Sequence, residues 1–586
     1  MKKINLLLIS ILLLSFSANA SSVSDESIFR AMKDEIDRSM SGLKIDGLEK
    51  PYFIEYRLEI LSPFSLEASL GSVVSESANK MARLSVSVKV GDYKFDNSNF
   101  FDVGLNFFGS SDDQQRFKKR SVSFEPDYDY LRRELWLATD AAFKQSAELY
   151  SKKIATLKNK IRRDTTPYFL HSEPSQNSFI KDIPKLDTNK FRELLRKISF
   201  IFTDFPEINS SAVALEFIPR SVYYMNSEGT SFRSDDYYTG LEVVASTKTQ
   251  DGMPLGDYYT AFSRYPENLP AAGQMLFLAK RLAKGLSFSY HAEAIEDDYN
   301  GPVLFYGNAA AELLAQHFLP NLVAQRKPVS EGGFSAGNNT LAFQRKIGGR
   351  VLPDFLSVSA LPNMKKYSST ELLGNYEIDG DGLVPDSVLL VENGYLKNLL
   401  SSRVPTKKVM KSNAHKREGA AMVSTIQFKS NGNTANRDSL KKKLIEICLE
   451  RDLEYGIIVD RIINPNVFAT TMYNSNPGLF PFMDSKGSFM PTRLIKIYTD
   501  GREEFTRGLI GKNVNTRTFR DIILTSDESS AYNYLGRAVI SPFISGGSQY
   551  VGSTVITPEF LLEDFELIMY EKDFTKTQIV KNPITK

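Results

Sequence analysis

Two kinds of hydrophobic spacing alternate in the first part of the chain and predict both helices and strands. Between residues 25 and 40 apolar side chains recur every four positions, which predicts a helix. In residues 51–61 apolar and polar side chains alternate strictly, and residues 84–90 repeat that pattern. Strict alternation is typical of an antiparallel sheet with one covered face.

A second set of elements follows before residue 300. Residues 130–160 contain no Gly or Pro and are rich in Ala, Leu, Lys and Glu, which predicts a long helix. Residues 164–190 mix Pro, Ser, Asn and charged residues and predict a connecting segment, and residues 271–284 predict another helix. The strands predicted between these two segments span residues 213–217, 222–225, 241–250 and 258–262.

From residue 299 onward most of the pattern predicts short strands separated by turn pairs such as Asn393-Gly394. Helices are predicted only at residues 309–318 and from 438 or 439 to about 453. We therefore predict an α+β fold with two domains. An N-terminal α/β part with an antiparallel sheet and long helices occupies residues 21–298, and a β-rich C-terminal domain occupies residues 299–586.

The first 20 residues have the pattern of a signal peptide. Lys2 and Lys3 precede an apolar run over residues 6–16, and Ala18-Asn19-Ala20 is typical of a cleavage site. The run is shorter than the roughly 20 apolar residues that span a bilayer, and no later stretch reaches that length. We expect an exported chain that starts near Ser21, is periplasmic or secreted, and does not insert into the membrane.

Charge and cysteine content narrow the function classes further. The chain has 72 Lys and Arg against 70 Asp and Glu, and removing the signal peptide leaves 70 of each. This balance disfavours a nucleic-acid-binding protein, which usually has a basic excess. Cys448 is the one cysteine, so no intramolecular disulfide can form, and it lies on the apolar face of a predicted helix, where it acts as a small hydrophobic residue.

Metal-binding chemistry has few candidate residues. No H-E-x-x-H motif occurs, and the four histidines are His171, His291, His317 and His415. A zinc site built from His291, His317 and His415 is one alternative, but surface or packing roles are the simpler interpretation. The stretch from Asp379 to Gly382 resembles the start of a calcium loop but lacks its later ligands, which favours a tight turn.

One motif suggests a nucleophile. Residues 333–337 match G-x-S-x-G, with Ser335 at the position of a hydrolase nucleophile. The chemistry needs a strand before the serine and a helix after it, whereas polar residues flank it on both sides. A flexible loop is the simpler interpretation, and a Ser335 hydrolase is kept as an alternative.

Several segments in the same order resemble the TldD/PmbA family, once called modulators of DNA gyrase. They are residues 301–305 (GPVLF), 309–314 (AAAELL), 350–355 (RVLPDF), 373–377 (LGNYE), 391–394 (VENG) and 498–508 (YTDGREEFTRG). Residues 222–229 (VYYMNSEG) are similar to a strand and turn of the N-terminal half. The resemblance covers most of residues 50–570 and implies a metallopeptidase-related fold.

The resemblance also implies what has been lost. TldD-type members carry H-E-x-x-x-H on the helix after the alanine pair, and aligning on Ala309-Ala310 places Ala315, Gln316 and Pro320 at its three positions. Zinc hydrolysis of the family type is therefore not expected here, and we assign no metal, no cofactor and no catalytic residue. The chain resembles PmbA-type members, which lack the motif and pair with a TldD-type subunit around an enclosed peptide chamber.

Our leading hypothesis is an exported, metal-free TldD/PmbA-like protein that binds extended or unfolded peptide or supports a catalytic partner. The partner is a TldD-type subunit or a second copy in a homodimer. The loop over residues 411–419 (KSNAHKREG) is the predicted cavity lining, with Asn413, His415 and Arg417 as peptide-binding residues. The alternatives are an active peptidase or hydrolase that uses the histidine site or Ser335, and a purely structural envelope protein.

Overall fold

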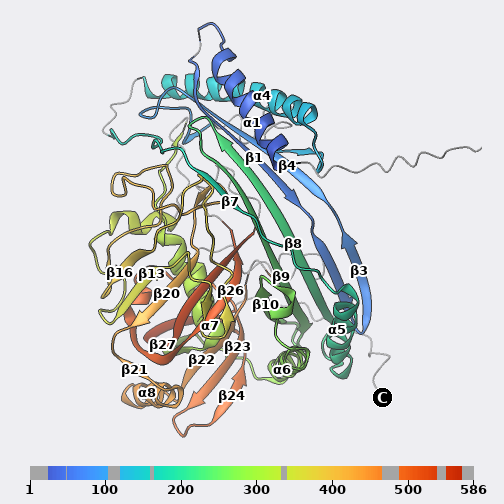
Figure 1. Cartoon of the computed structure of the whole chain (residues 1–586). Coiled ribbons are helices and arrows are strands. Elements are labelled where there is room, and N and C mark those ends of the chain that lie inside the picture. Colours follow the sequence, from blue (N-terminus) through green and yellow to red (C-terminus); the bar gives the residue numbers. More distant parts are fainter. Residues whose placement is uncertain are drawn as a thin grey trace, which may run out of the picture.

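The computed structural model describes residues 24–47, 49–102, 119–158, 164–330, 339–464, 467, 487–537 and 550–570. Two large sheets organise these residues (Figure 1). One sheet uses strands from the N-terminal half and is antiparallel except for one edge strand, and the other is a mixed sheet built from the C-terminal half. The predicted α+β class is confirmed.

The N-terminal sheet has the strand order β10-β9-β8-β1-β4-β6. A short hairpin, β2 and β3, extends it next to β8, and β7 pairs in parallel with β9. The strands are β1 (Pro51–Leu61), β2 (Phe64–Ser69), β3 (Ser72–Ala78), β4 (Met81–Val90), β6 (Lys119–Val122), β7 (Gln176–Phe179), β8 (Ser210–Asn226), β9 (Ser231–Lys248) and β10 (Pro254–Ser263).

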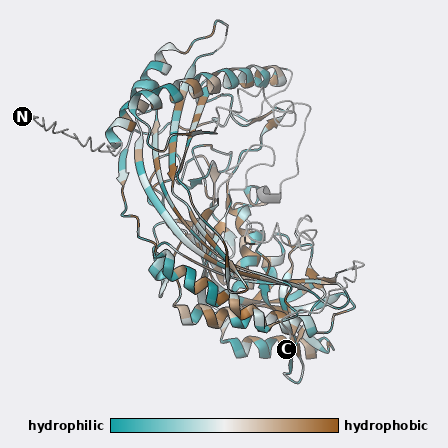
Figure 2. Cartoon of the chain, turned by 90° about the vertical axis from the view of Figure 1, so that its right-hand side faces the viewer, coloured by the Kyte–Doolittle hydropathy of each residue, from teal (hydrophilic) through white to brown (hydrophobic). Residues whose placement is uncertain are grey.

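Helices cover the two ends of this sheet separately. Helices α1 (Asp25–Gly42) and α4 (Tyr128–Leu157) pack on β1 and β4 at one end, and α5 (Thr188–Phe200) and α6 (Ala272–His291) pack at the other (Figures 1 and 2). In α1 the side chain of Ser24 accepts a hydrogen bond from the backbone of Ser27 and caps the first turn. The apolar residues of that helix are buried against the sheet, as their spacing predicts.

Two predicted segments differ from the structure. The strands predicted at residues 213–217 and 222–225 form one long strand, β8, that runs through Pro219. Pro219 lies where the strand that pairs with β8 changes from β2 to β1. Proline has no N–H, and at this junction neither β2 nor β1 pairs with residue 219, so no hydrogen bond between strands is lost. The connecting segment predicted over residues 164–190 contains β7 and the start of α5.

The C-terminal sheet has the strand order β17-β16-β13-β20-β27-β11-β22-β23-β24. Strands β21, β25 and β26 join it beside this path. Its strands are β11 (Tyr299–Phe305), β13 (Leu356–Ala360), β16 (Val388–Glu392), β17 (Tyr395–Leu396), β20 (Thr425–Ser430), β21 (Thr434–Ala435), β22 (Tyr455–Ile462), β23 (Pro491–Tyr498), β24 (Glu503–Thr506), β25 (Leu509–Gly511), β26 (Ile522–Gly536) and β27 (Val551–Met569). Two-residue strands outside both large sheets are β5 (Phe100–Phe101), β12 (Val329–Ser330), β14 (Lys366–Tyr367), β15 (Thr370–Glu371), β18 (Lys416–Arg417) and β19 (Ala420–Ala421).

Both faces of the C-terminal sheet are covered at its centre. In β11, Val303 and Phe305 pack into the main core, whereas Leu304 faces α8 (Arg437–Glu450). The buried Cys448 lies on that helix among Leu440, Leu444 and Ile447. Burial on both faces explains why β11 and its parallel neighbour β22 carry continuous apolar runs instead of alternating ones.

The helix predicted over residues 309–318 is shorter and less regular than expected. Regular α7 spans Gly307–Leu313, a π-helical turn spans Leu314–Phe318, and a 3₁₀ turn spans Leu319–Leu322. Pro320 lies in the last turn and has no N–H for a helical hydrogen bond. The regular α-helix therefore ends before the proline, and the π-helical turn that follows it is wider than an α-helical turn.

A buried charge cluster joins the two halves. Asp257 of β10 accepts hydrogen bonds from Arg461 of β22 at 3.0 Å and from Arg493 of β23 at 2.9 Å.

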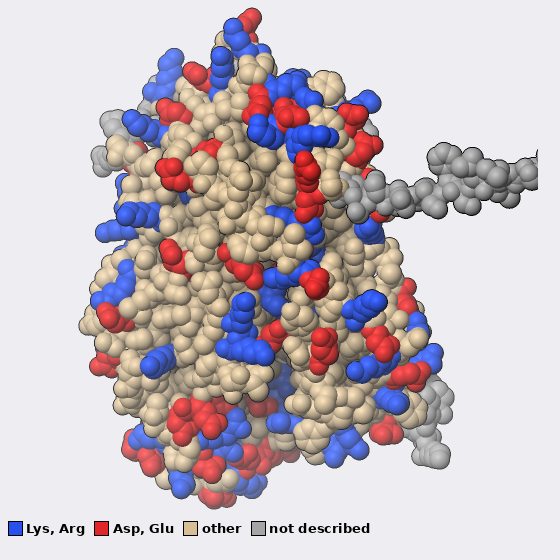
Figure 3. All heavy atoms as spheres, in the orientation of Figure 1, with Lys and Arg blue, Asp and Glu red and all other residues tan. Residues whose placement is uncertain are grey.

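On the face drawn in Figure 3, cationic and anionic side chains are interspersed, in keeping with the balanced composition. No helix among the described residues is both long enough and apolar enough to cross a membrane.

Candidate functional site

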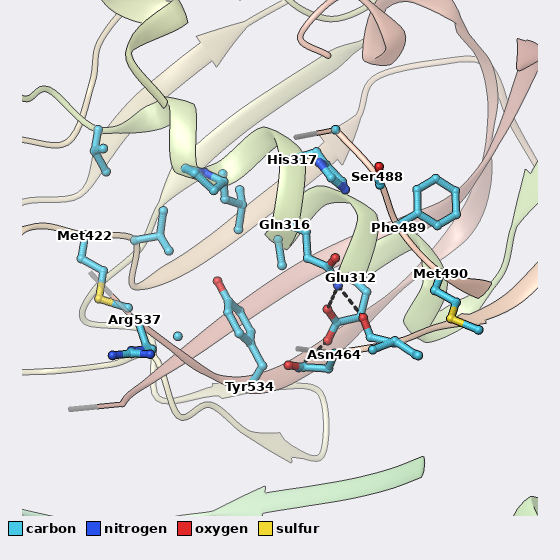
Figure 4. A pocket seen from close by; sticks show the side chains of 18 of the residues that line it. Glu312, Gln316, His317, Met422, Asn464, Ser488, Phe489, Met490, Tyr534 and Arg537 are labelled. Carbon is cyan, nitrogen blue, oxygen red and sulfur yellow. Dashed lines mark hydrogen bonds between the residues drawn. The ribbon is translucent and has the colours of Figure 1, made fainter. Parts of the chain in front are cut away.

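A cavity of about 410 Å³ lies against the π-helical turn that follows α7 (Figure 4). This volume lies within the range of small-molecule and cofactor sites, about 300–1,000 Å³. The cavity is lined by Glu312, Ala315, Gln316, His317, Leu319, Pro320, Val323, Ala421, Met422, Val423, Ile463, Asn464, Gly487, Ser488, Phe489, Met490, Tyr534, Gly536 and Arg537. The segments that line it come from five separate parts of the sequence, so only the fold brings them together.

A buried glutamate forms part of the cavity wall. Glu312 sits at the end of α7, and its carboxylate accepts hydrogen bonds from Gln316 Nε2 at 2.8 Å, from Asn464 Nδ2 at 2.7 Å and from the hydroxyl of Tyr532. Gln316 also donates to the backbone oxygen of Ile463 at 2.8 Å. Both amide hydrogens of Gln316 are therefore used inside the protein, and this pair ties α7 to the end of β22.

The partners of Glu312 are neutral, which determines its acidity. Burial raises the pKa of Glu312 to about 7, and the hydrogen bonds from Tyr532, Gln316 and Asn464 only partly offset this rise. No cation forms an ion pair with Glu312 among the residues that the structure describes. The cavity therefore contains a carboxyl group that changes charge near neutral pH.

His317 supplies the imidazole of the cavity. Its ring lies 6.3 Å from the ring of Phe489, measured between centroids, and burial lowers its pKa to about 4. The imidazole is therefore neutral at pH 7. Its Nε2 atom is buried and has no hydrogen-bond partner among the described residues.

The side chains at this helix do not fit a zinc ion. Zinc needs about three ligands from neutral imidazoles, thiolates or carboxylates. Ala315 offers a methyl group, Pro320 has no donor atom, and the Gln316 amide is engaged with Glu312. In the described part of the chain no group of three or more His, Cys, Asp or Glu residues could hold a metal ion.

The alternative histidine site is not formed. His291 ends α6 and is exposed, His317 lines the cavity, and His415 is fully buried beside its own loop. These three residues do not meet as a metal-binding group within the described ranges. Ser335 lies outside the described residues, so the hydrolase alternative stays a prediction.

The loop predicted to bind peptide uses many of its polar atoms internally. Asn413 donates to Leu399 O at 2.9 Å and accepts from the backbone N–H of Ser401 at 2.7 Å. His415 Nδ1 lies 2.7 Å from Asn413 O, and burial lowers its pKa to about 4. None of Asn413, His415 and Arg417 lines the large cavity. Peptide binding by these three residues stays a prediction.

Arg417 faces a different and smaller cavity. Its guanidinium donates to Val423 O at 3.0 Å and to Gly552 O at 2.7 Å, and it lies over the ring of Tyr376. It also lines a charged cavity of about 70 Å³ at the junction of the two sheets. The hairpin β18–β19 therefore has Arg417 at the small cavity, while Ala421 at its end faces the large one.

The aspartate-rich turn behaves as the sequence predicts. Asp379 Oδ1 accepts from the backbone N–H groups of Asp381 and Leu383, both at 2.9 Å, and Gly382 has a positive φ of 82°. Asp381 pairs with Lys416 at 2.7 Å instead of facing a shared cation position. Both carboxylates are thus occupied by the turn and by its lysine neighbour.

Several residues of the large cavity could not be found from the sequence. Asn464, Phe489, Met490 and Tyr534 lie 150 or more residues after α7 and carry no motif. By contrast Ala315, Gln316 and Pro320, which the family resemblance singled out, all line it. The positions of the family's metal motif therefore lie on one wall of the cavity, and the fold supplies the opposite wall.

Comparisons with known proteins agree with this architecture. Residues 298–481 match the family model described as the PmbA/TldA metallopeptidase C-terminal domain. No curated protein sequence matches the chain.

The fold matches solved structures over almost the whole chain. A candidate modulator of a DNA gyrase from Thermotoga maritima aligns with a TM-score of 0.57 at 13% identity, covering 92% of this chain and 100% of that one. TldE from Thermococcus kodakarensis aligns with a TM-score of 0.54 at 12% identity and 92% and 100% coverage. A candidate modulator of DNA gyrase from Bacteroides thetaiotaomicron aligns with a TM-score of 0.55 at 12% identity, covering 93% of this chain and 100% of that one. At such low identity these structures establish a shared fold, and the family match is that of residues 298–481 to the PmbA/TldA metallopeptidase C-terminal domain.

Proposed function

We propose that the chain is an exported, metal-free member of the TldD/PmbA family that binds extended or unfolded peptide, or supports a catalytic TldD-type partner in proteolysis. One observation carries the proposal: the family's metal helix borders a cavity here, but presents Ala315, Gln316 and Pro320 to it. A cavity of this size with apolar walls and a few polar groups is suited to binding. The side chains needed for zinc hydrolysis are missing from that helix.

The lining explains why peptide is the favoured ligand. Most of the wall is apolar, from residues such as Leu319, Val323, Met422 and Phe489, and it can remove one or two side chains from water. The hydrogen-bonding capacity of Glu312 is largely directed at Gln316, Asn464 and Tyr532. A ligand would therefore be held mainly by burial of apolar surface.

A peptidase assay tests the catalytic part of the proposal. The purified full chain is incubated with an unfolded protein substrate, alone and with a TldD-type subunit that retains H-E-x-x-x-H. We expect no chelator-sensitive cleavage by the chain alone, and cleavage by the partner that the chain accelerates or redirects. Chelator-sensitive cleavage by the chain alone, with stoichiometric zinc, would contradict the proposal.

The same assay tests the Ser335 hydrolase and the structural envelope protein. We expect Ser335→Ala to leave any measured activity unchanged, whereas loss of activity in this variant would support the hydrolase. A structural envelope protein would neither bind the substrate nor associate with a TldD-type subunit. Co-purification from a mixture of the two chains therefore distinguishes a supporting subunit from an isolated structural protein.

Export is a separate part of the proposal, supported by the pattern of residues 1–20. Mass spectrometry of the mature protein from a cell-envelope fraction should find Ser21 as the first residue. A chain that keeps Met1 and stays with the cytosolic fraction would contradict export without affecting the proposed peptide binding.

A further inference from the structure

We infer that the large cavity selects ligands that join an apolar body to a carboxylate, of which the carboxyl-terminal residue of a peptide is the favoured case. This inference rests on the proposed function and specifies which end of a peptide enters the cavity. It follows from the distribution of charge and of unused hydrogen-bonding groups around the wall.

Two charged side chains line the cavity within the described ranges. Glu312 and Arg537 are the charged side chains in the wall, and Figure 4 shows Tyr534 lying between them. The carboxyl of Glu312 is held by neutral donors within the protein. Arg537 is exposed and lies over the ring of Tyr550, with 5.2 Å between its guanidinium carbon and the ring centroid. Among the described residues no carboxylate forms an ion pair with Arg537.

Arg537 is exposed at one end of the cavity, where it can meet an anion. Figure 4 shows its side chain beside Met422 at one end of the cavity, with Phe489 and Met490 at the opposite end. A guanidinium recognises a carboxylate through two parallel N–H donors, which a neutral amide cannot replace. The apolar lining residues would then surround the side chain attached to that carboxylate.

The cavity lining also offers an unused polar atom on His317. Nε2 of His317 is buried and unpaired among the described residues, and its neutral ring can donate or accept depending on its tautomer. An unpaired buried polar atom is unfavourable, so a ligand group that reaches His317 would gain a hydrogen bond. The wall therefore prefers a ligand with an anionic end, an apolar body and a neutral polar group.

Binding measurements on the full chain test the inference. The probes are an acetylated tripeptide ending in leucine with a free carboxylate, the same tripeptide with a carboxyl-terminal amide, and decanoate. We expect the free carboxylate to bind about tenfold tighter than the amide, the ratio that a difference of about 1.4 kcal/mol produces. The variant Arg537→Gln should remove this preference while keeping the weaker binding of the amide.

Arg502→Gln is the matched control. Arg502 is also an exposed arginine over a tyrosine ring, that of Tyr498 at 4.0 Å, but it does not line the cavity. Arg502→Gln should leave the preference for the free carboxylate over the amide unchanged. Thermal unfolding should show that Arg537→Gln and Arg502→Gln are both folded. Ala315→Phe, which fills the cavity, should weaken every probe.

The outcomes separate the inference from the proposed function. Equal binding of carboxylate and amide, or no effect of Arg537→Gln, overturns the inference and leaves peptide binding intact. Arg537-dependent binding of decanoate without either peptide supports the ligand chemistry and contradicts the peptide function. Failure of all three probes to bind overturns both.

Discussion

Asp257 and Glu312 are buried to the same extent, about 1% exposed, but in opposite electrostatic surroundings. Asp257 joins the two halves through Arg461 and Arg493, and Arg493 also pairs with Asp460 at 3.1 Å. In the part of the chain that the structure describes, the hydrogen-bond donors to Glu312 are the amides of Gln316 and Asn464 and the hydroxyl of Tyr532. One carboxyl is compensated by charge, and the other is compensated only by dipoles.

The difference distinguishes a structural carboxylate from one whose charge can change. A buried ion pair is held by mutual attraction, and removing one partner leaves an uncompensated charge. A buried carboxyl among neutral donors loses solvation without gaining a counter-charge, so its pKa rises, here to about 7. The compensated group fixes how the halves meet, while the uncompensated one faces the cavity.

The largest expected effect comes from breaking the compensated cluster. Arg493→Met leaves Asp257 with one arginine and should lower the free energy of unfolding by about 3 kcal/mol, measured by denaturant titration. Lys33→Met is the control, because its pair with Asp37 is exposed and screened by solvent, so this variant should leave the free energy of unfolding nearly unchanged. A loss below about 1 kcal/mol for Arg493→Met would show that the cluster does not hold the halves together.

The pH dependence of the free energy of unfolding, compared between Glu312→Gln and the natural chain, tests the raised pKa of the Glu312 carboxyl. The folded-state pKa of about 7 lies above the ordinary value of 4.5, so the folded state binds more protons between these values. Glu312 therefore lowers stability as pH rises from about 5 to about 8. Relative to the natural chain, Glu312→Gln should become more stable over that interval by about 2–3 kcal/mol. A difference that does not change with pH would contradict the raised pKa.

His317→Phe gives a smaller effect with the opposite sign. The pKa of His317 is lowered to about 4 from 6.5, so the unfolded chain binds more protons between these values and stability falls as pH falls through them. The phenylalanine variant should lose this acid sensitivity, so its free energy of unfolding should fall by about 1 kcal/mol less than that of the natural chain on acidification. The effect is small because the ring borders an open cavity. Urea titrations at pH 4.5 and 7 measure the change. Unchanged acid sensitivity would mean that the imidazole is solvated.

The sequence predicted local elements better than their junctions. The four-residue spacing in α1 buries one face of that helix, and Ile54, Tyr56 and Leu58 of the alternating strand β1 lie in the same core. The prediction divided β8 into two strands, whereas the structure continues it through Pro219, where the pairing of β8 changes from β2 to β1. Such a position is determined by tertiary pairing and leaves no local signal.

The candidate site was predictable on one side only. The family resemblance pointed to Ala315, Gln316 and Pro320, and all three line the cavity. Nothing in the local sequence shows that Asn464 and Tyr532 would surround Glu312, since the fold brings them from 152 and 220 residues away. Partners this distant become visible only when the sheet order is known.

We propose that the cavity beside α7 binds peptide without zinc. The direct measurement is elemental analysis of the purified full chain, followed by fluorescence anisotropy with a labelled unfolded peptide before and after exhaustive chelation. The account predicts far less than one zinc per chain and the same peptide affinity in both states. One tightly held zinc per chain, with peptide binding lost on chelation and restored by zinc, would contradict it.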